Sequence, residues 1–173
     1  DHRKGMFSRE TIEFFEGIGA SIGIALAHKR HADEIQVNRE RLEKAQEIGH
    51  LGSWEYDFKT RKISATREGF RIFGLDSDKS VYPIETIEAC IPERERIHRA
   101  LIDLIESGKE YDLEYAINPA DGSPPRFITS VGEVARDSDG HAVKIFGMIQ
   151  DITKRKQTEE QIEKAHQETR RLL

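Results

Sequence analysis

Cysteine is nearly absent from this sequence, and so is any long apolar run. The one cysteine, Cys90, excludes an internal disulfide and suits a reducing compartment. The most apolar segment, residues 18–27, is too short to span a bilayer and is interrupted by glycines. The N-terminus also lacks the pattern of a signal peptide. These absences predict a cytoplasmic protein without a membrane-spanning segment.

An excess of positive charge is missing too. Lys and Arg total 27 against 32 Asp and Glu, which gives a formal net charge of −5 and a pI of about 5.8. A chain with this balance is poorly suited to the phosphate backbone, so nucleic acid is not an expected partner. The mean hydropathy is −0.65, and Phe and Tyr are concentrated between residues 54 and 146. The core is therefore expected in that range, with solvated helix at both ends.

Recognisable catalytic motifs are absent as well. The sequence has no glycine-rich phosphate loop, no paired cysteine ligands and no His-Glu-x-x-His pattern. His28 and His31 lie three residues apart, but no Asp, Glu or Cys completes a ligand set around them, so we expect no metal site. The chain is therefore not expected to be an enzyme. Because it starts at Asp1 rather than Met, we expect it to be a piece of a longer protein.

The most informative stretch runs from residue 141 to residue 173, where a strand pattern passes directly into a helix pattern. Both faces of the strand are apolar, one through Val143, Ile145 and Ile149 and the other through Phe146 and Met148. A strand of this kind is usually covered on both faces, which predicts a central position in a sheet. A central strand that continues into a helix can transmit a change in the core to whatever follows.

Two long helices are expected at the ends of the chain, one over residues 8–48 and one from residue 154. Apolar residues recur in both at the three- and four-residue spacings of a coiled-coil seam. An apolar helix with no domain to bury it must find cover in a partner chain, so we expect a homodimer; a lone solvated connector helix is the alternative. The residues expected at the dimer interface are Ile12, Phe15, Ile18, Ile22, Ile35, Leu42, Ile162 and Leu172.

Between these helices the sequence alternates in the manner of strands joined by short turns. Strands are expected at residues 54–58, 62–65, 111–118, 127–136 and 143–149, and helices at residues 66–73 and 93–106. Two strands, then helices, then three strands predict an α+β fold, with an antiparallel sheet and helices on one face.

Several short motifs in this region stand in a fixed order. They are Leu51-Gly52-Ser53-Trp54-Glu55, Ile72-Phe73-Gly74, Ile91-Pro92-Glu93-Arg94, Glu114-Tyr115, Asp121-Gly122-Ser123, and Gly147 followed by Asp151-Ile152-Thr153-Lys154-Arg155-Lys156. In this order they resemble a PAS domain of bacterial sensor kinases. The resemblance implies a five-stranded antiparallel sheet of order 2-1-5-4-3. It divides the chain into a signalling helix (1–48, with an apolar part similar to the last helix of a GAF domain), a PAS domain (49–153) and a coiled-coil linker helix (154–173).

The PAS resemblance also implies a pocket for a small molecule between the sheet and the helices. The expected lining residues are Phe70, Phe73, Leu101, Tyr115 and Phe127. Side chains that fill the pocket are the alternative, because protein interiors normally pack without voids. Flavin is not expected, since Cys90 lies in Ala89-Cys90-Ile91-Pro92 rather than in the Asn-Cys-Arg-Phe-Leu-Gln run of photosensory domains. Haem through His98 is a further alternative, and no cofactor is the favoured interpretation.

The resemblance finally implies a sensory and signal-relay function, with an output domain such as a kinase or cyclase outside this sequence. Asp151, Ile152 and Thr153 form the family's usual exit motif, and we expect the Thr153 hydroxyl to cap the helix that follows. A histidine kinase fragment with His166 as the phosphoacceptor is the competing interpretation. A pure dimerisation module with a filled core is a third.

Overall fold

The computed structural model describes residues 9–171, with side chains described from residue 22 to residue 170. The chain divides into two units at Lys44/Ala45, and each is considered by itself. The first unit is formed by helix α1 (Arg9–Gly49), whose last residues belong to the second unit. Within α1 the side chains of Ile22, Ile35 and Leu42 are exposed. The single continuous helix follows from the absence of proline before Pro83.

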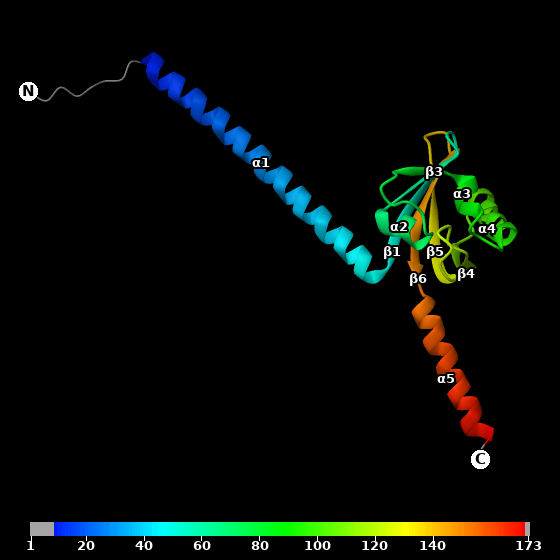
Figure 1. The fold of residues 1–173 in the computed structure, drawn as a ribbon. Coiled ribbons are helices and arrows are strands. Elements are labelled where there is room, and N and C mark those ends of the chain that lie inside the picture. Colours follow the sequence, from blue (N-terminus) through cyan, green and yellow to red (C-terminus); the bar gives the residue numbers. More distant parts are fainter. Residues whose placement is uncertain (1–8, 172–173) are drawn as a thin grey trace, which may run out of the picture. The chain divides into compact units, whose positions relative to one another are not determined.

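The second unit holds the sheet and the remaining helices (Figure 1). Its strands are β1 (Leu51–Asp57), β2 (Lys62–Ala65), β3 (Val81–Pro83), β4 (Tyr111–Ile117), β5 (Arg126–Arg136) and β6 (Ala142–Asp151). Its helices are α2 (Arg67–Ile72), α3 (Ile84–Glu88), α4 (Arg94–Ser107) and α5 (Thr153–Arg171).

The sheet is antiparallel, with strand order β3-β2-β1-β6-β5-β4. The predicted order of five strands is confirmed, and β6 lies in the middle as expected. The predicted number of strands is wrong by one, because the short strand β3 pairs with β2 at the edge of the sheet. Pro83 at the end of β3 lacks an amide hydrogen, which suits an edge strand and makes the segment look like a loop in the sequence.

Strand β1 starts earlier than predicted. Leu51 pairs with Gln150 and Gly52 with Ile149, so the ladder with β6 includes Gly52 and begins three residues before Trp54. Gly52 is needed for packing: a Cβ atom there would lie 2.4 Å from Cα of Gly69 in α2. The close approach of these two glycines sets α2 directly against β1.

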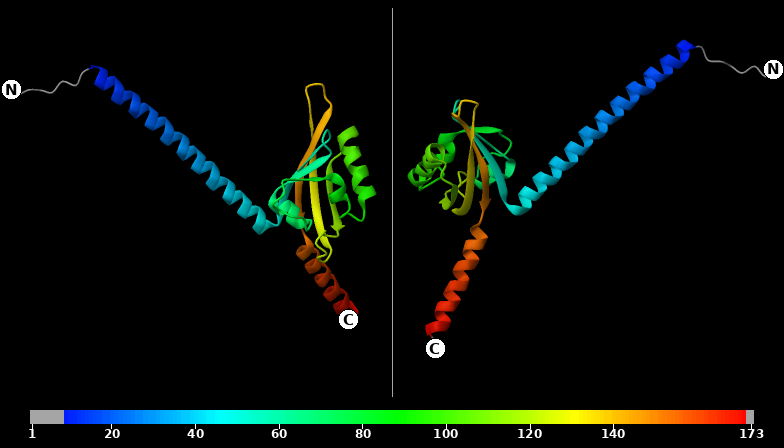
Figure 2. Two further views of the ribbon diagram at one scale, coloured as in Figure 1. Left: turned by 45° about the horizontal axis from the view of Figure 1, so that its top comes forward. Right: turned by 180° about the vertical axis from the view of Figure 1, so that it is seen from behind.

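Helices α2, α3 and α4 lie on one face of the sheet, which we call the inner face (Figure 2). The core lies between them, and its most deeply buried residues include Phe70, Ile117, Ile128 and Ile145. Tyr111, Tyr115 and Ile117 point to this side of β4, as their alternation predicts.

The opposite, outer face of the sheet is partly exposed in the single chain. Ile145 and Ile149 of β6 are buried on the inner face, but Phe146 and Met148 are 44% and 39% exposed on the outer face. Val131 of β5 lies beside them and is 40% exposed. Helices α2, α3 and α4 lie on the inner face (Figure 2) and leave this face of β6 uncovered, so cover on both faces of β6 by a partner chain stays a prediction.

Candidate functional site

A cavity of about 320 Å³ lies between the inner face of the sheet and helices α2, α3 and α4. Its wall is almost entirely aliphatic and aromatic. Of the predicted lining residues, Phe70 and Phe73 contribute from α2 and its end, Leu101 from α4, and Tyr115 from β4. The core is thus hollow at this place, although Phe70, Phe73 and Tyr115 are each at least nine-tenths buried.

Phe127 lies elsewhere. It directly precedes Ile128, which is fully buried, and successive residues of a strand point to opposite faces. The Phe127 side chain is therefore on the outer side and is 44% exposed. Its prediction as a lining residue is a register error of one position. Ser130, two residues beyond Ile128, reaches the cavity from the same strand.

Three hydroxyl groups form the main polar feature of the cavity wall. Tyr111, Tyr115 and Ser130 are all buried on the inner face of neighbouring strands β4 and β5. Burial raises the pKa of Tyr115 well above 10, and the neighbouring Tyr111 raises it further. Burial also raises the pKa of Tyr111, partly offset by hydrogen bonding with Ser130 and Tyr115. These phenols are therefore neutral hydrogen-bond donors at physiological pH.

Trp54 of β1 also lines the cavity, and two glycines make room for its ring. Trp54 pairs with Gly147, which pairs with Gly132 on the other side. A Cβ atom on Gly147 would lie 2.9 Å from the indole, and one on Gly132 would lie 3.4 Å from it. The indole Nε1 is the one buried side-chain nitrogen or oxygen atom in the described residues that lacks a hydrogen-bond partner.

Among the described residues, acidic and basic side chains border the cavity where α3 meets the first half of α4. Nδ1 of His98 lies 3.7 Å from a carboxylate oxygen of Glu88, and Arg94 lies nearby in the cavity lining. The His98 side chain is 65% exposed. His98 thus borders the cavity from the exposed side of α4, and haem binding through His98 stays an alternative prediction.

A second candidate region is the junction where β6 passes into α5. The Asp151 carboxylate accepts hydrogen bonds from the Thr153 amide at 2.9 Å and the Thr153 hydroxyl at 2.5 Å. The Thr153 oxygen in turn accepts a hydrogen bond from the Phe127 amide of β5 at 3.0 Å. The predicted capping role of Thr153 is therefore corrected: Asp151 supplies the acceptor, and Thr153 fixes the helix start to the sheet. Ile152 is buried, as an anchor should be.

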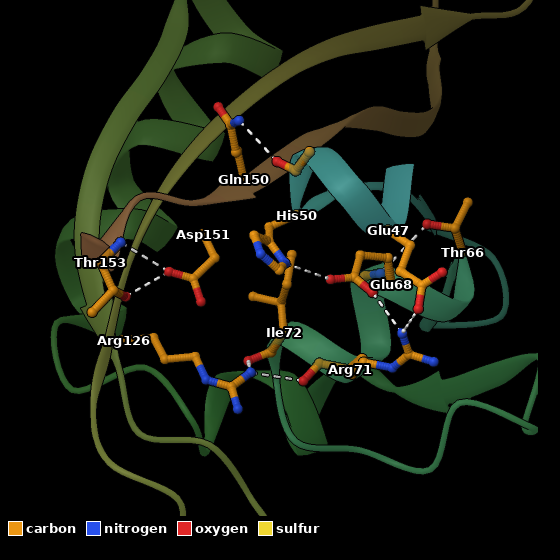
Figure 3. A network of polar contacts seen from close by, with 12 residues as sticks. Glu47, His50, Thr66, Glu68, Arg71, Ile72, Arg126, Gln150, Asp151 and Thr153 are labelled. Carbon is orange, nitrogen blue, oxygen red and sulfur yellow. Dashed lines mark hydrogen bonds and ion pairs between the residues drawn. The ribbon is translucent and has the colours of Figure 1, made fainter. Parts of the chain in front are cut away.

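The same junction holds the end of α1 (Figure 3). The Asp151 amide donates to the backbone oxygen of His50 at 3.0 Å, and the Gln150 side chain donates to the Gly49 oxygen at 3.0 Å. The residues just before β1 and at the end of β6 are therefore hydrogen-bonded to each other. The start of β1 and the end of β6, each next to a flanking helix, are thus held together at this junction.

Helix α2 links this junction to the cavity. On one side, Phe70 lines the cavity. On the other, the buried carboxylate of Glu68 contacts Nδ1 of His50 at 3.3 Å and is paired with Arg71 at 3.0 Å (Figure 3). Arg71 also lies 3.5 Å from Glu47 of α1. Helix α2 thus faces the cavity with Phe70 and contacts the residue after α1 with Glu68.

Arg126 fixes the other end of α2. Its guanidinium donates to the backbone oxygens of Arg71 and Ile72, both at 2.8 Å. Such contacts satisfy the last carbonyl groups of a helix and suit the negative end of its dipole. Because Arg126 begins β5, the short helix is attached to the strand that also contacts Thr153.

An ionic contact between the sheet and α5 was not predicted from the sequence. Glu114 of β4 accepts hydrogen bonds from Arg155 and pairs with Lys156 at 2.5 Å. The hydrogen bonds from Lys156 and Arg155 lower the pKa of Glu114. Three basic residues in the first turn of a helix are unfavourable toward its dipole, and Glu114 offsets that repulsion. The Glu114-Tyr115 motif is recognisable in the sequence, but the pairing of Glu114 with Arg155, 41 residues away, is not.

The other predicted residues lie outside both regions. Ile162 and His166 are exposed on α5. The side chains of Ile12, Phe15 and Ile18, and all of Leu172, fall outside the described residues. Three exposed groups at the β5–β6 turn, from Asp137, Asp139 and His141, come within 4.8 Å of one another and could hold a cation; no other such cluster occurs among the described side chains.

Comparison with known families decides the relationship. Residues 62–149, just over half of the chain, match the sequence profile described as the PAS fold. The chain belongs to the PAS family. The predicted recognition and fold class are thereby confirmed, apart from the additional edge strand.

The PAS domain also resembles parts of larger signalling proteins. A blue-light-activated histidine kinase of Brucella anthropi is 28% identical over 127 residues, which cover 73% of this chain and 25% of that protein. The chain therefore spans about a quarter of the curated relatives it matches. A sensory box histidine kinase/response regulator from Burkholderia thailandensis has a solved structure that is 27% identical, with a TM-score of 0.61. That comparison covers 76% of this chain and 98% of the solved one.

A third similarity concerns the fold alone. The N-terminal domain of a diguanylate cyclase with a PAS/PAC sensor, from Marinobacter aquaeolei, has a TM-score of 0.52 at 19% identity, over 61% of this chain and 97% of that one. The PAS domain is thus a sensory module of the kind found in histidine kinases. None of its described helices has the length and apolar character that crossing a membrane requires.

Proposed function

We propose that this PAS domain senses a small molecule in its cavity and relays occupancy to α1 and α5. The observation that carries the proposal is the position of α2, which contributes Phe70 to the cavity wall and holds the end of α1 through Glu68 and Arg71. The sheet supplies a second route, since β6 lines the cavity with Ile145 and Ile149 and ends at Asp151. Both routes converge on the contact between His50 and Asp151.

The cavity-to-junction coupling can be tested by filling the cavity. Ala65 of β2 lines it, so Ala65→Phe places a ring inside. We expect amide hydrogen exchange at residues 150–156 to change by about threefold or more, because local opening responds to small shifts in stability. Hydrogen exchange followed by mass spectrometry measures this directly.

Ser64→Phe is the matched control. It adds the same ring one position earlier on β2, where the side chain points to the opposite face. Unchanged exchange at the junction in Ala65→Phe, with the domain folded, would contradict the proposed relay. An equal change in both variants would do the same, since it would show an effect of added bulk rather than of occupancy.

The domain is proposed to act as a homodimer in the cytoplasm, without catalytic activity of its own. Exposed apolar side chains on both terminal helices support association, namely Ile22, Ile35, Leu42 and Ile162. Kinase or cyclase activity is proposed for an output domain in the same protein. A histidine kinase role for His166 predicts phosphate on that residue after incubation with ATP, which His166→Ala would abolish.

Dimerisation is expected at micromolar concentration in sedimentation experiments. Because apolar contact drives association and the seams in both helices are polar, the N-terminal part of α1 should contribute most. Ile18→Glu combined with Ile22→Glu is expected to weaken the dimer at least tenfold. Val37→Glu is the control, since Val37 is exposed in α1 but lies at an outward position of the seam through Ile35 and Leu42. A monomer at all concentrations would contradict the dimer.

A further inference from the structure

The chemistry of the cavity wall restricts what it can bind. Among the described side chains, the acidic or basic residues that line it are Glu88, Arg94 and His98, and all three lie on α3 and α4 at the border of the cavity. The Glu88 and His98 side chains are 35% and 65% exposed and lie close to each other. The inner wall, formed by the sheet and α2, offers hydrocarbon, hydroxyl groups and one indole.

A charged group deep in this cavity would have no counter-ion. The hydroxyl groups of Tyr111, Tyr115 and Ser130 are neutral, and burial keeps the pKa of both phenols above the usual value. Transfer of an unpaired charge into such a site is strongly unfavourable. The inner wall therefore excludes carboxylates, phosphates and ammonium groups from its depth.

One donor nevertheless lacks an acceptor. The Trp54 Nε1 group is buried with no hydrogen-bond partner, which is unfavourable relative to a satisfied group. The Tyr115 hydroxyl is hydrogen-bonded with Tyr111 and Ser130, so these three hydroxyl groups can add a further polar contact to a ligand. Trp54 and Tyr115 both line the cavity, so a carbonyl or ether oxygen placed there would satisfy a donor that the protein leaves open.

The volume sets the size of the occupant. An apolar cavity of about 150 Å³ accommodates benzene, with six non-hydrogen atoms. At about 320 Å³, this cavity is about twice as large, so it has room for a molecule of about a dozen non-hydrogen atoms.

We propose that the cavity binds an uncharged, largely apolar molecule of about a dozen non-hydrogen atoms that carries one hydrogen-bond acceptor. This inference rests on the proposed sensing function, because it names the class of ligand for the same cavity. The acceptor lies toward Trp54 and Tyr115, and the hydrocarbon part lies against Phe70, Leu101 and Ile145.

Three bicyclic compounds of similar size test each feature. They are tetralin, which has no acceptor, 1-tetralone, which has one carbonyl oxygen, and 1-naphthoate, which carries a charge. The sequence contains a single tryptophan, so selectively excited tryptophan fluorescence of the 173-residue chain reports on Trp54. Titration calorimetry gives the dissociation constants independently.

We expect 1-tetralone to bind about tenfold more tightly than tetralin, which corresponds to one net hydrogen bond to a buried donor. We expect 1-naphthoate to bind most weakly. Tyr115→Phe should reduce the preference for 1-tetralone. Tyr82→Phe should leave it unchanged, since the Tyr82 hydroxyl donates to the Asp76 backbone oxygen and the residue does not line the cavity.

Two outcomes would overturn the ligand class and leave the sensing function standing. They are binding of 1-naphthoate at least as tight as that of 1-tetralone, and equal binding of tetralin and 1-tetralone. If none of the three bound at millimolar concentration, both the ligand class and small-molecule sensing in this cavity would be overturned.

Discussion

Gly147→Ala is expected to lower the free energy of unfolding by about 3 kcal/mol or more, because the added methyl group has no space. Its Cβ would lie 2.0 Å from the Val131 backbone oxygen and 2.9 Å from both Gly132 Cα and the Trp54 ring. A rotamer change can move the indole but not the neighbouring strand. The central pair of strands must therefore separate or the ring must leave its place. With typical sensitivity to urea, the unfolding midpoint should fall by about 1–3 M.

Gly49→Ala is the control for this substitution. The nearest atom to a Cβ at Gly49 is 3.9 Å away, so the same change meets ordinary contact at the end of α1. We expect its free energy of unfolding to stay within about 1 kcal/mol of the parent value. Equal urea midpoints for the two variants would contradict the packing described for Trp54 over the glycines. Because Trp54 fluorescence follows the same ring, its emission spectrum should also shift in Gly147→Ala.

Asp151→Ala is expected to separate folding from signalling. The variant loses the acceptor for the Thr153 amide and hydroxyl, which should cost about 1–2 kcal/mol, as for the loss of a helix cap. The core residues are untouched, so the domain should stay folded and dimeric. Amides in the first turn of α5 should exchange about tenfold faster. In the intact signalling protein, output should no longer follow the stimulus.

Asp151→Asn provides the matched comparison, because its amide oxygen can still accept the hydrogen bond from Thr153. We expect it to retain most of the protection of α5 and most of the response. If Asp151→Ala responded normally to the stimulus, Asp151 would be an ordinary helix cap. The coupling would then have to run through Glu68 and Arg71 of α2 instead.

Local patterns were sufficient to predict much of the fold. Alternation placed Tyr111, Tyr115 and Ile117 on one face of β4, and the two apolar faces of the last strand placed it centrally. These features depend on neighbours in the sequence and on the period of a strand. Strand β3 was missed because three residues with a proline carry no periodic signal.

The site was less predictable, because its contacts join distant residues. The four correctly placed aromatic and aliphatic side chains came from the family resemblance, while Phe127 was assigned to the wrong face by one position. The pairing of Glu114 with Arg155 spans 41 residues. The Thr153 hydroxyl oxygen accepts a hydrogen bond from the Phe127 amide of β5, and Asp151 supplies the acceptor at the start of α5. The spacing of residues in the sequence carries no information on these contacts between distant segments.

The hydrogen bond from the Asp151 amide to the His50 oxygen has an evolutionary consequence. It places the residue that precedes the first strand beside the last residue of the last central strand, at a separation of 3.0 Å between the two atoms. Units with adjacent ends are readily inserted into other chains, because the host backbone hardly needs to be interrupted. Recombination could therefore insert this domain into a helical connector, or remove it, as one unit. Such an exchange would couple an existing output domain to a different stimulus without a change in the structure of either domain.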